Sequence, residues 1–104
     1  MPLALIAYFF GGVFAANSIP HLVSGVLGTE LQTPFASPPF KGLSSPAVNV
    51  AWGSFNLALS YVLVLQVADF DPRRWLHTAV CFAGFTAMAF QCARGFKRLR
   101  EPSR

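Results

Sequence analysis

The sequence predicts an all-α membrane protein in which a single domain, residues 1–104, forms a bundle of three transmembrane helices. Composition is the first observation behind this fold class. Of the residues, 54% are hydrophobic and only 12% are charged, whereas a typical soluble domain is about 25% charged. The second observation is that the apolar residues gather in three blocks, each long enough for the roughly 20 residues that a helix needs to cross a bilayer. Lipid is therefore expected to surround most of the chain.

The first predicted span covers about residues 2–28 and carries polar residues, among them Asn17 and His21, where an ordinary membrane helix would carry leucines. Pro20 has no amide hydrogen to donate to the preceding turn, so we expect this helix to be kinked there. A cleaved signal peptide is the competing interpretation of the block. No Lys or Arg precedes the apolar run, which favours a membrane span.

A proline-rich segment, residues 29–46, separates the first two spans and cannot form a continuous helix. Its apolar residues, such as Leu31, Phe35 and Phe40, favour a loop folded against the membrane interface, and a flexible solvated linker is the alternative. The run Ser44-Ser45-Pro46 predicts the start of the next helix, because serine caps helices and proline is accepted in the first turn.

The second span is predicted at about residues 47–68 and the third at about residues 75–96. In the second span, small and polar residues recur at helical spacing and predict one inward face; they are Asn49, Gly53, Asn56 and Ser60. Ahead of the third span, Asp71 and Pro72 form a helix-start signal, and Trp75 is expected to anchor at the interface.

Small residues that allow two helices to approach closely occur in all three spans. The predicted packing residues are Gly11, Gly12, Ala15, Ala16, Gly53, Ala79, Ala83 and Ala87. The alternative is that these are incidental small residues on faces that contact lipid.

Basic residues are concentrated in and before a tail at residues 97–104. Three spans place the two termini on opposite sides, and Lys41 lies on the same side as this tail. Because Lys and Arg favour the cytoplasmic side, the predicted topology is N-out and C-in. The residues expected to contact anionic lipid headgroups are Arg94, Lys97, Arg98 and Arg100. We expect no nucleic-acid partner, because the basic cluster is short and is attached to no nucleic-acid-binding fold.

This topology allows polar residues of the three spans to be compared by depth. Asn17 falls level with Asn56 and Thr86, and His21 falls near Trp52 and Gln91, while Tyr8, Gln66 and His77 share an outer level. We expect a polar layer, a candidate ligand or proton site, formed by Asn17, His21, Asn49, Trp52, Asn56, Thr86 and Gln91. Polar groups in hydrocarbon must find partners, so Asn17, His21, Asn56, Thr86 and Gln91 are expected to face inward. The alternative is that the layer only holds the helices together.

The sequence predicts no metal site and no cofactor. His21 and His77 lie at opposite membrane boundaries, so they are not expected to bind one haem, and no pair of candidate ligands has a recognised metal-binding spacing. Cys81 and Cys92 are about 16 Å apart along one helix, too far for a disulfide. The chain resembles small multidrug-resistance transporters in length only, since it lacks their glutamate in the first span.

Two strings carry a further resemblance: Asn17-Ser18-Ile19-Pro20-His21 in the first span, and Asn49-Val50-Ala51-Trp52-Gly53-Ser54-Phe55-Asn56 in the second. These patterns are similar to those of small bacterial integral membrane proteins that have no assigned activity. The resemblance covers about the first two spans. It implies the bacterial inner membrane as the location and identifies no catalytic residue.

The sequence favours a non-enzymatic subunit or scaffold that self-associates or joins a larger membrane complex, because three spans enclose little interior. The alternative function is an oligomeric channel or transporter that uses the polar layer to pass a small solute or a proton. A membrane redox or haem accessory subunit is a third, weaker interpretation.

Overall fold

The computed structural model describes residues 2–100. Three long helices and one small hairpin follow one another in the order α1 (Pro2–Val26), β1 (Leu31–Gln32), β2 (Leu43–Ser44), α2 (Pro46–Tyr61) and α3 (Trp75–Arg100). A π-helical turn, η1 (Val62–Gln66), continues α2. Each of the three helices, with η1 counted as part of α2, is long and apolar enough to cross a membrane. The predicted bundle of three apolar helices is therefore confirmed.

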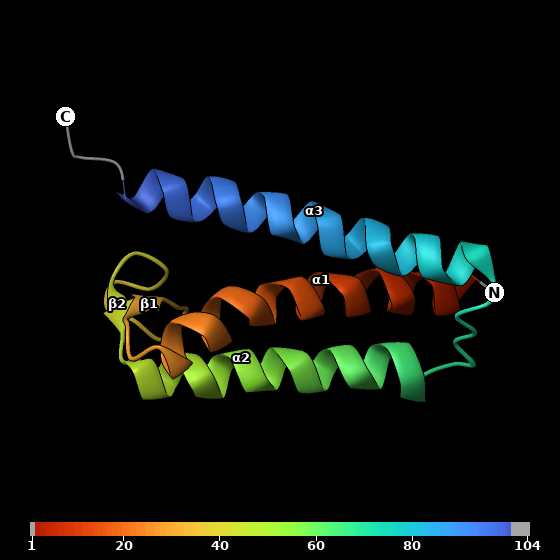
Figure 1. Cartoon of the computed structure of the whole chain (residues 1–104), viewed down its shortest axis with the longest axis horizontal. Helices are drawn as coiled ribbons and strands as arrows, with labels where there is room; N and C mark the ends of the chain where they lie inside the picture. The colour runs from red at the N-terminus through yellow and green to blue at the C-terminus, as the bar shows by residue number, and fades with distance from the viewer. Residues whose placement is uncertain (1, 101–104) are drawn as a thin grey trace.

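The three helices run side by side and alternate in direction (Figure 1). α1 lies in the middle and packs against both α2 and α3, whereas α2 and α3 make little contact with each other. Glycines permit the closest approaches. A side chain at Gly53 of α2 would collide with Leu22 of α1, and a side chain at Gly12 of α1 would collide with the carbonyl oxygen of Cys81 on α3. The backbone of α1 is therefore the core of the molecule.

The predicted start of α2 is confirmed at atomic level. Pro46 is the first helical residue, and the Ser45 hydroxyl accepts a hydrogen bond of 3.2 Å from the amide of Val48. A free amide at a helix start is commonly satisfied in this way.

α3 begins at Trp75, where the third span was predicted to begin, but the predicted helix-start roles of Asp71 and Pro72 are wrong because both residues precede the helix. The carboxylate of Asp71 instead accepts a hydrogen bond of 2.9 Å from the amide of Arg73, which closes a turn before the helix. At its other end α3 continues to Arg100, so the first part of the predicted tail is helical. Residues 101–104 of that tail lie outside the described residues.

The proline-rich segment contains a hairpin that the sequence analysis did not predict. β1 and β2 pair antiparallel, with Leu31 opposite Ser44 and Gln32 opposite Leu43. Beyond the strands, the carbonyl oxygen of Thr33 accepts from the amides of Ala36 and Phe40. The hydroxyls of Thr33 and Ser44 also hydrogen-bond each other. The segment is therefore an ordered cap on one end of the bundle.

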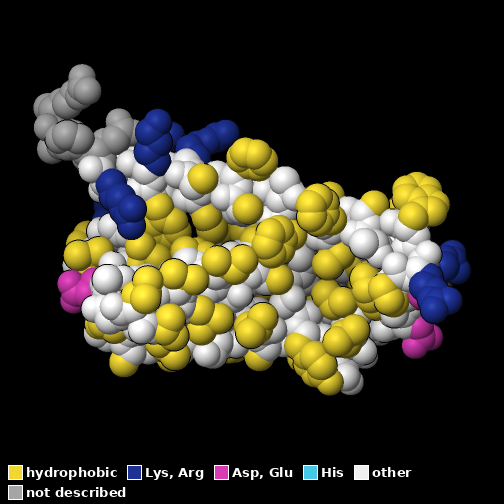
Figure 2. Space-filling view, viewed as in Figure 1, with side chains coloured by type: hydrophobic (Ala, Val, Ile, Leu, Met, Phe, Trp, Pro, Cys, Tyr) yellow, Lys and Arg dark blue, Asp and Glu magenta, His cyan; other side chains and the backbone are white. Residues whose placement is uncertain are grey.

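Charged side chains gather at the two ends of the molecule, and the long middle section of the surface is mostly apolar (Figure 2). Phe10, Phe55 and Phe90 are among the large apolar side chains exposed there. This distribution is the one expected for helices whose middle lies in hydrocarbon and whose ends lie at headgroups.

Candidate functional site

Asn49, near the start of α2, joins the hairpin to the helices. Its side chain is 0% exposed. The amide nitrogen donates to the carbonyl oxygens of Leu31 at 3.2 Å, Ser44 at 3.1 Å and Ser45 at 3.1 Å. One side chain thus satisfies backbone acceptors on both strands and on the cap of α2, which buried carbonyls require.

His21 of α1 contacts the other end of the Asn49 side chain, with 2.8 Å between the imidazole Nδ1 and Asn49 Oδ1. Three carbonyl oxygens surround the Asn49 nitrogen, so the amide orientation is fixed and its oxygen must accept from His21. In a neutral imidazole, a proton on Nδ1 leaves Nε2 as a free acceptor. Every fully enclosed side-chain nitrogen and oxygen in residues 2–100 has a hydrogen-bond partner. No described residue bonds to Nε2, so this atom opens to the space beside the ring.

A second polar cluster lies one turn nearer to the middle of the bundle. The Asn17 amide on α1 donates to Asn56 Oδ1 on α2 at 3.0 Å. Asn56 in turn donates to the carbonyl oxygen of Trp52 at 2.8 Å. From α3, the thiol of Cys92 donates a long bond of 3.7 Å to Asn17 Oδ1. The predicted match in depth between Asn17 and Asn56 is therefore confirmed as a direct contact.

These clusters border a cavity of about 420 Å³, called the polar cavity below. Its lining includes Asn17, His21, Gln32, Trp52, Gln91 and Phe96. The imidazole of His21 stands edge-on to the rings of Trp52 and Phe96, with ring centres 6.5 and 6.0 Å apart. All three helices and the loop after β1 contribute to this cavity, which combines amides, an imidazole acceptor and aromatic walls.

The predicted polar layer is partly assembled here. Asn17, His21, Trp52 and Gln91 line the polar cavity, and Asn49 and Asn56 lie behind it, bonded to His21 and Asn17. Gln91 was expected to face inward, but its side chain is exposed, and Thr86 is half-buried without lining the cavity. The sequence analysis missed Gln32 and Phe40, which reach the cavity because of the hairpin. No strand pattern in the sequence indicated that fold.

The predicted packing residues differ in burial from helix to helix. Gly11, Gly12, Ala16 and Gly53 are buried and Ala15 is half-buried, whereas Ala79, Ala83 and Ala87 are all exposed. The close approach on α3 is made instead at Gly84, where a side chain would collide with the carbonyl oxygen of Phe9. Within residues 2–100, the three alanines are therefore not buried against another helix. The four cations expected at headgroups, Arg94, Lys97, Arg98 and Arg100, are exposed.

The opposite end of the bundle holds an aromatic cluster rather than a polar site. The Tyr8 ring lies 4.9 Å from the His77 ring and 5.0 Å from the Phe70 ring. His77 Nδ1 accepts from the amide of Asp71 at 3.0 Å, so this histidine is oriented by the turn before α3. Tyr8 and His77 were expected at one depth and are in contact. In the described part of the chain, no three of His, Cys, Asp and Glu lie close enough to hold a metal ion.

Neither a family model, nor a curated protein, nor a solved structure matches the chain significantly. The resemblance to small bacterial membrane proteins therefore remains a prediction.

Proposed function

We propose that this chain is a non-enzymatic integral membrane protein of the bacterial inner membrane, and that it self-associates or joins a larger membrane complex through α3. In the bilayer it takes the N-out, C-in orientation, with α1 bent at Pro20. The apolar middle surface and the basic end of α3 support this orientation.

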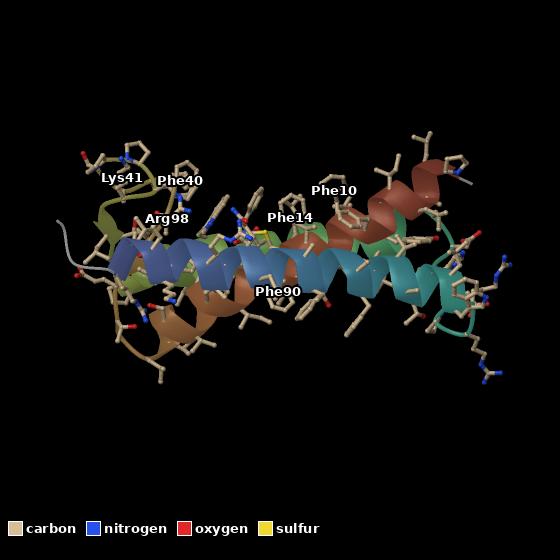
Figure 3. The ribbon with its side chains drawn as sticks, turned by 90° about the horizontal axis from the view of Figure 1, so that it is seen from above. Phe10, Phe14, Phe40, Lys41, Phe90 and Arg98 are labelled. Carbon is tan, nitrogen blue, oxygen red and sulfur yellow. The ribbon has the colours of Figure 1, made fainter. Side chains whose placement is uncertain are left out.

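The observation that carries the proposal is the exposure of α3, which packs mainly against α1 and leaves its other face uncovered. Among the described residues of this helix, only Gly84 is buried. The face turned away from α1 carries Ala79, Ala83 and Ala87, all exposed. Figure 3 shows α3 in front, with Phe90 on the opposite side from Phe10 and Phe14. Small residues at four-residue spacing allow a second helix to approach closely, and such close packing is one of the contributions that drive helix association in lipid.

The test is subunit counting by single-molecule fluorescence in liposomes. Ala83→Leu places a large side chain in the proposed interface and should convert oligomers to monomers. Ala58→Leu makes the same change at an exposed position of α2 and should leave the oligomers unchanged. If the unsubstituted chain is monomeric and crosslinks to no partner in its host, the proposal fails.

The polar cavity supports a second candidate function, the passage of a small solute or a proton. The supporting observation is that His21, Asn17 and Gln91 line one cavity of about 420 Å³. An imidazole placed in this way can accept and release a proton.

Proton flux into liposomes containing the full chain tests this candidate. His21→Ala should abolish flux, whereas His77→Ala, at the aromatic end, should leave it intact. If the unsubstituted chain gives no more proton flux than empty liposomes, this function is excluded. An equal loss of flux in His21→Ala and His77→Ala would also exclude it.

A further inference from the structure

A long apolar groove lies between α1 and α3, separate from the polar cavity. Its volume is about 730 Å³. Cys92 and Phe96 line both spaces and form the wall between them. The remaining lining is apolar along most of its length, with Ile19 and Pro20 from α1 and Ala89 from α3. Ligand pockets in proteins usually range from about 300 to 1,000 Å³.

The groove exists because α1 and α3 touch closely at one level and then diverge. The contact level is set by Gly12 against Cys81 and by Gly84 against Phe9. From there the two helices separate towards the end that carries the hairpin (Figure 1). A second hollow of about 330 Å³ shares Ile19, Pro20, Phe96 and Arg100 with the first and extends it along α1 to Leu27. The two hollows together form one elongated apolar surface.

Two cations, Lys97 and Arg100, lie at the wide end of this surface, in the last turn of α3. No Asp or Glu is among the described residues that line either hollow. The shape therefore combines an apolar wall within the predicted span with two positive charges at its predicted cytoplasmic boundary. Basic pockets between transmembrane helices at that boundary are suited to anionic headgroups.

We propose that the groove binds one anionic phospholipid, with an acyl chain along Ile19, Pro20 and Ala89 and the phosphate at Lys97 and Arg100. Free phosphate would leave the apolar wall unused. A zwitterionic phospholipid also carries a phosphate, but it brings its own ammonium group next to Lys97 and Arg100, so a lipid with a net negative charge fits these two cations better. The proposal depends on insertion of the helices in a bilayer, as the proposed function does, but not on self-association.

Arg98 was expected to contact headgroups like the two cations, but it lies outside the groove, so it provides a control for the groove itself. It is one residue from Lys97, yet it lies on the side of α3 that faces the loop residues Phe40 and Lys41 (Figure 3). It lines neither of the hollows that form the groove. A diffuse attraction of the tail for anionic membranes would weaken equally on removal of any of these charges, whereas a defined groove distinguishes them.

The experiment uses the full chain in nanodiscs with equal amounts of phosphatidylglycerol and phosphatidylcholine, and native mass spectrometry identifies the lipid retained after release. We expect one phosphatidylglycerol per chain and a preference over phosphatidylcholine of about tenfold. Lys97→Gln and Arg100→Gln, each made alone, should weaken the preference and together should abolish it, whereas the single change Arg98→Gln should retain it. Ala93→Phe fills the groove and should reduce retention with the cations intact, whereas Ala58→Phe on α2 should not.

Equal retention of the two lipids would overturn the proposal. Equal loss in Arg98→Gln and in the single variants Lys97→Gln and Arg100→Gln would also overturn it, because only diffuse charge would then be acting. Displacement of the lipid by inorganic phosphate at moderate concentration would show that the acyl chain contributes nothing. The monomeric variant Ala83→Leu should still retain the lipid, so failure of self-association and failure of lipid binding are distinguishable.

Discussion

α2 and α3 pack against opposite sides of the same helix by different means. The buried residues of α2 are Asn49, Gly53, Asn56 and Ser60, a face of small and polar side chains. Asn49 and Asn56 each bond to a polar side chain of α1. α3 buries Gly84 alone, and its side-chain hydrogen bond to α1 is the long one from the Cys92 thiol. α2 is therefore fixed by directional bonds and α3 by close apolar contact.

This difference matters because, in lipid, apolar contact does little to determine which surfaces of two helices pack together. Acyl chains are as apolar as leucine, so helices associate through close packing and hydrogen bonds rather than through hydrophobic burial. α1, the hairpin and α2 thus form the well-specified part of the fold. α3 makes fewer hydrogen bonds to α1 and leaves most of its surface exposed, and both the proposed interface and the proposed lipid groove involve this helix.

The largest expected effect follows from removing the side chain that joins α1, the hairpin and α2. Asn49→Leu leaves His21 Nδ1 and the carbonyl oxygens of Leu31 and Ser44 without this partner. Each buried polar group left unsatisfied costs about 1–3 kcal/mol, so we expect the free energy of unfolding to fall by about 3 kcal/mol. Denaturation from mixed micelles measures this loss, and limited proteolysis of residues 29–46 should show release of the hairpin.

Ser54→Leu is the control for that change. Ser54 is an exposed residue of α2, so the substitution should alter the free energy of unfolding by less than about 0.5 kcal/mol. If Asn49→Leu lowers the free energy of unfolding no more than this control does, hydrogen bonding does not fix α2. The two helices would then not differ in how they are held against α1.

The inward face of α2 could be predicted fully from sequence. Asn49, Gly53, Asn56 and Ser60 stand out among apolar neighbours, and helical spacing places them on one face. On α3 the same reasoning selected Ala79, Ala83 and Ala87, which are exposed. Alanine is acceptable both against a helix and against lipid, so its spacing defines a stripe but not the direction in which the stripe points.

The site was only partly predictable. The depth of a residue in the membrane can be counted along a helix, but the geometry of a loop cannot be derived from sequence in this way. Depth matched Asn17 with Asn56 and Tyr8 with His77, and both pairs are in contact. It also matched Asn17 with Thr86, which is wrong, because the α3 side chain that bonds to Asn17 is Cys92. The hairpin has strands of two residues each, too short for an alternating pattern to be visible. Its carbonyl groups are nevertheless what the amide nitrogen of Asn49 binds, and its loop closes one side of the polar cavity.

The smallest expected effect concerns the side chain of Asn17, which bonds to both α2 and α3. Asn17 bonds to Asn56 on α2 at 3.0 Å and to Cys92 on α3 at 3.7 Å. Double-mutant cycles with Asn17→Leu, Asn56→Leu and Cys92→Ala isolate each pair. We expect a coupling of about 1 kcal/mol for Asn17 with Asn56, near the upper range for interhelical bonds in membranes. For Asn17 with Cys92 we expect less than about 0.3 kcal/mol, because a thiol is a weak donor. Equal couplings would mean that α3 is held as specifically as α2, and that its uncovered face needs no external partner to fix it.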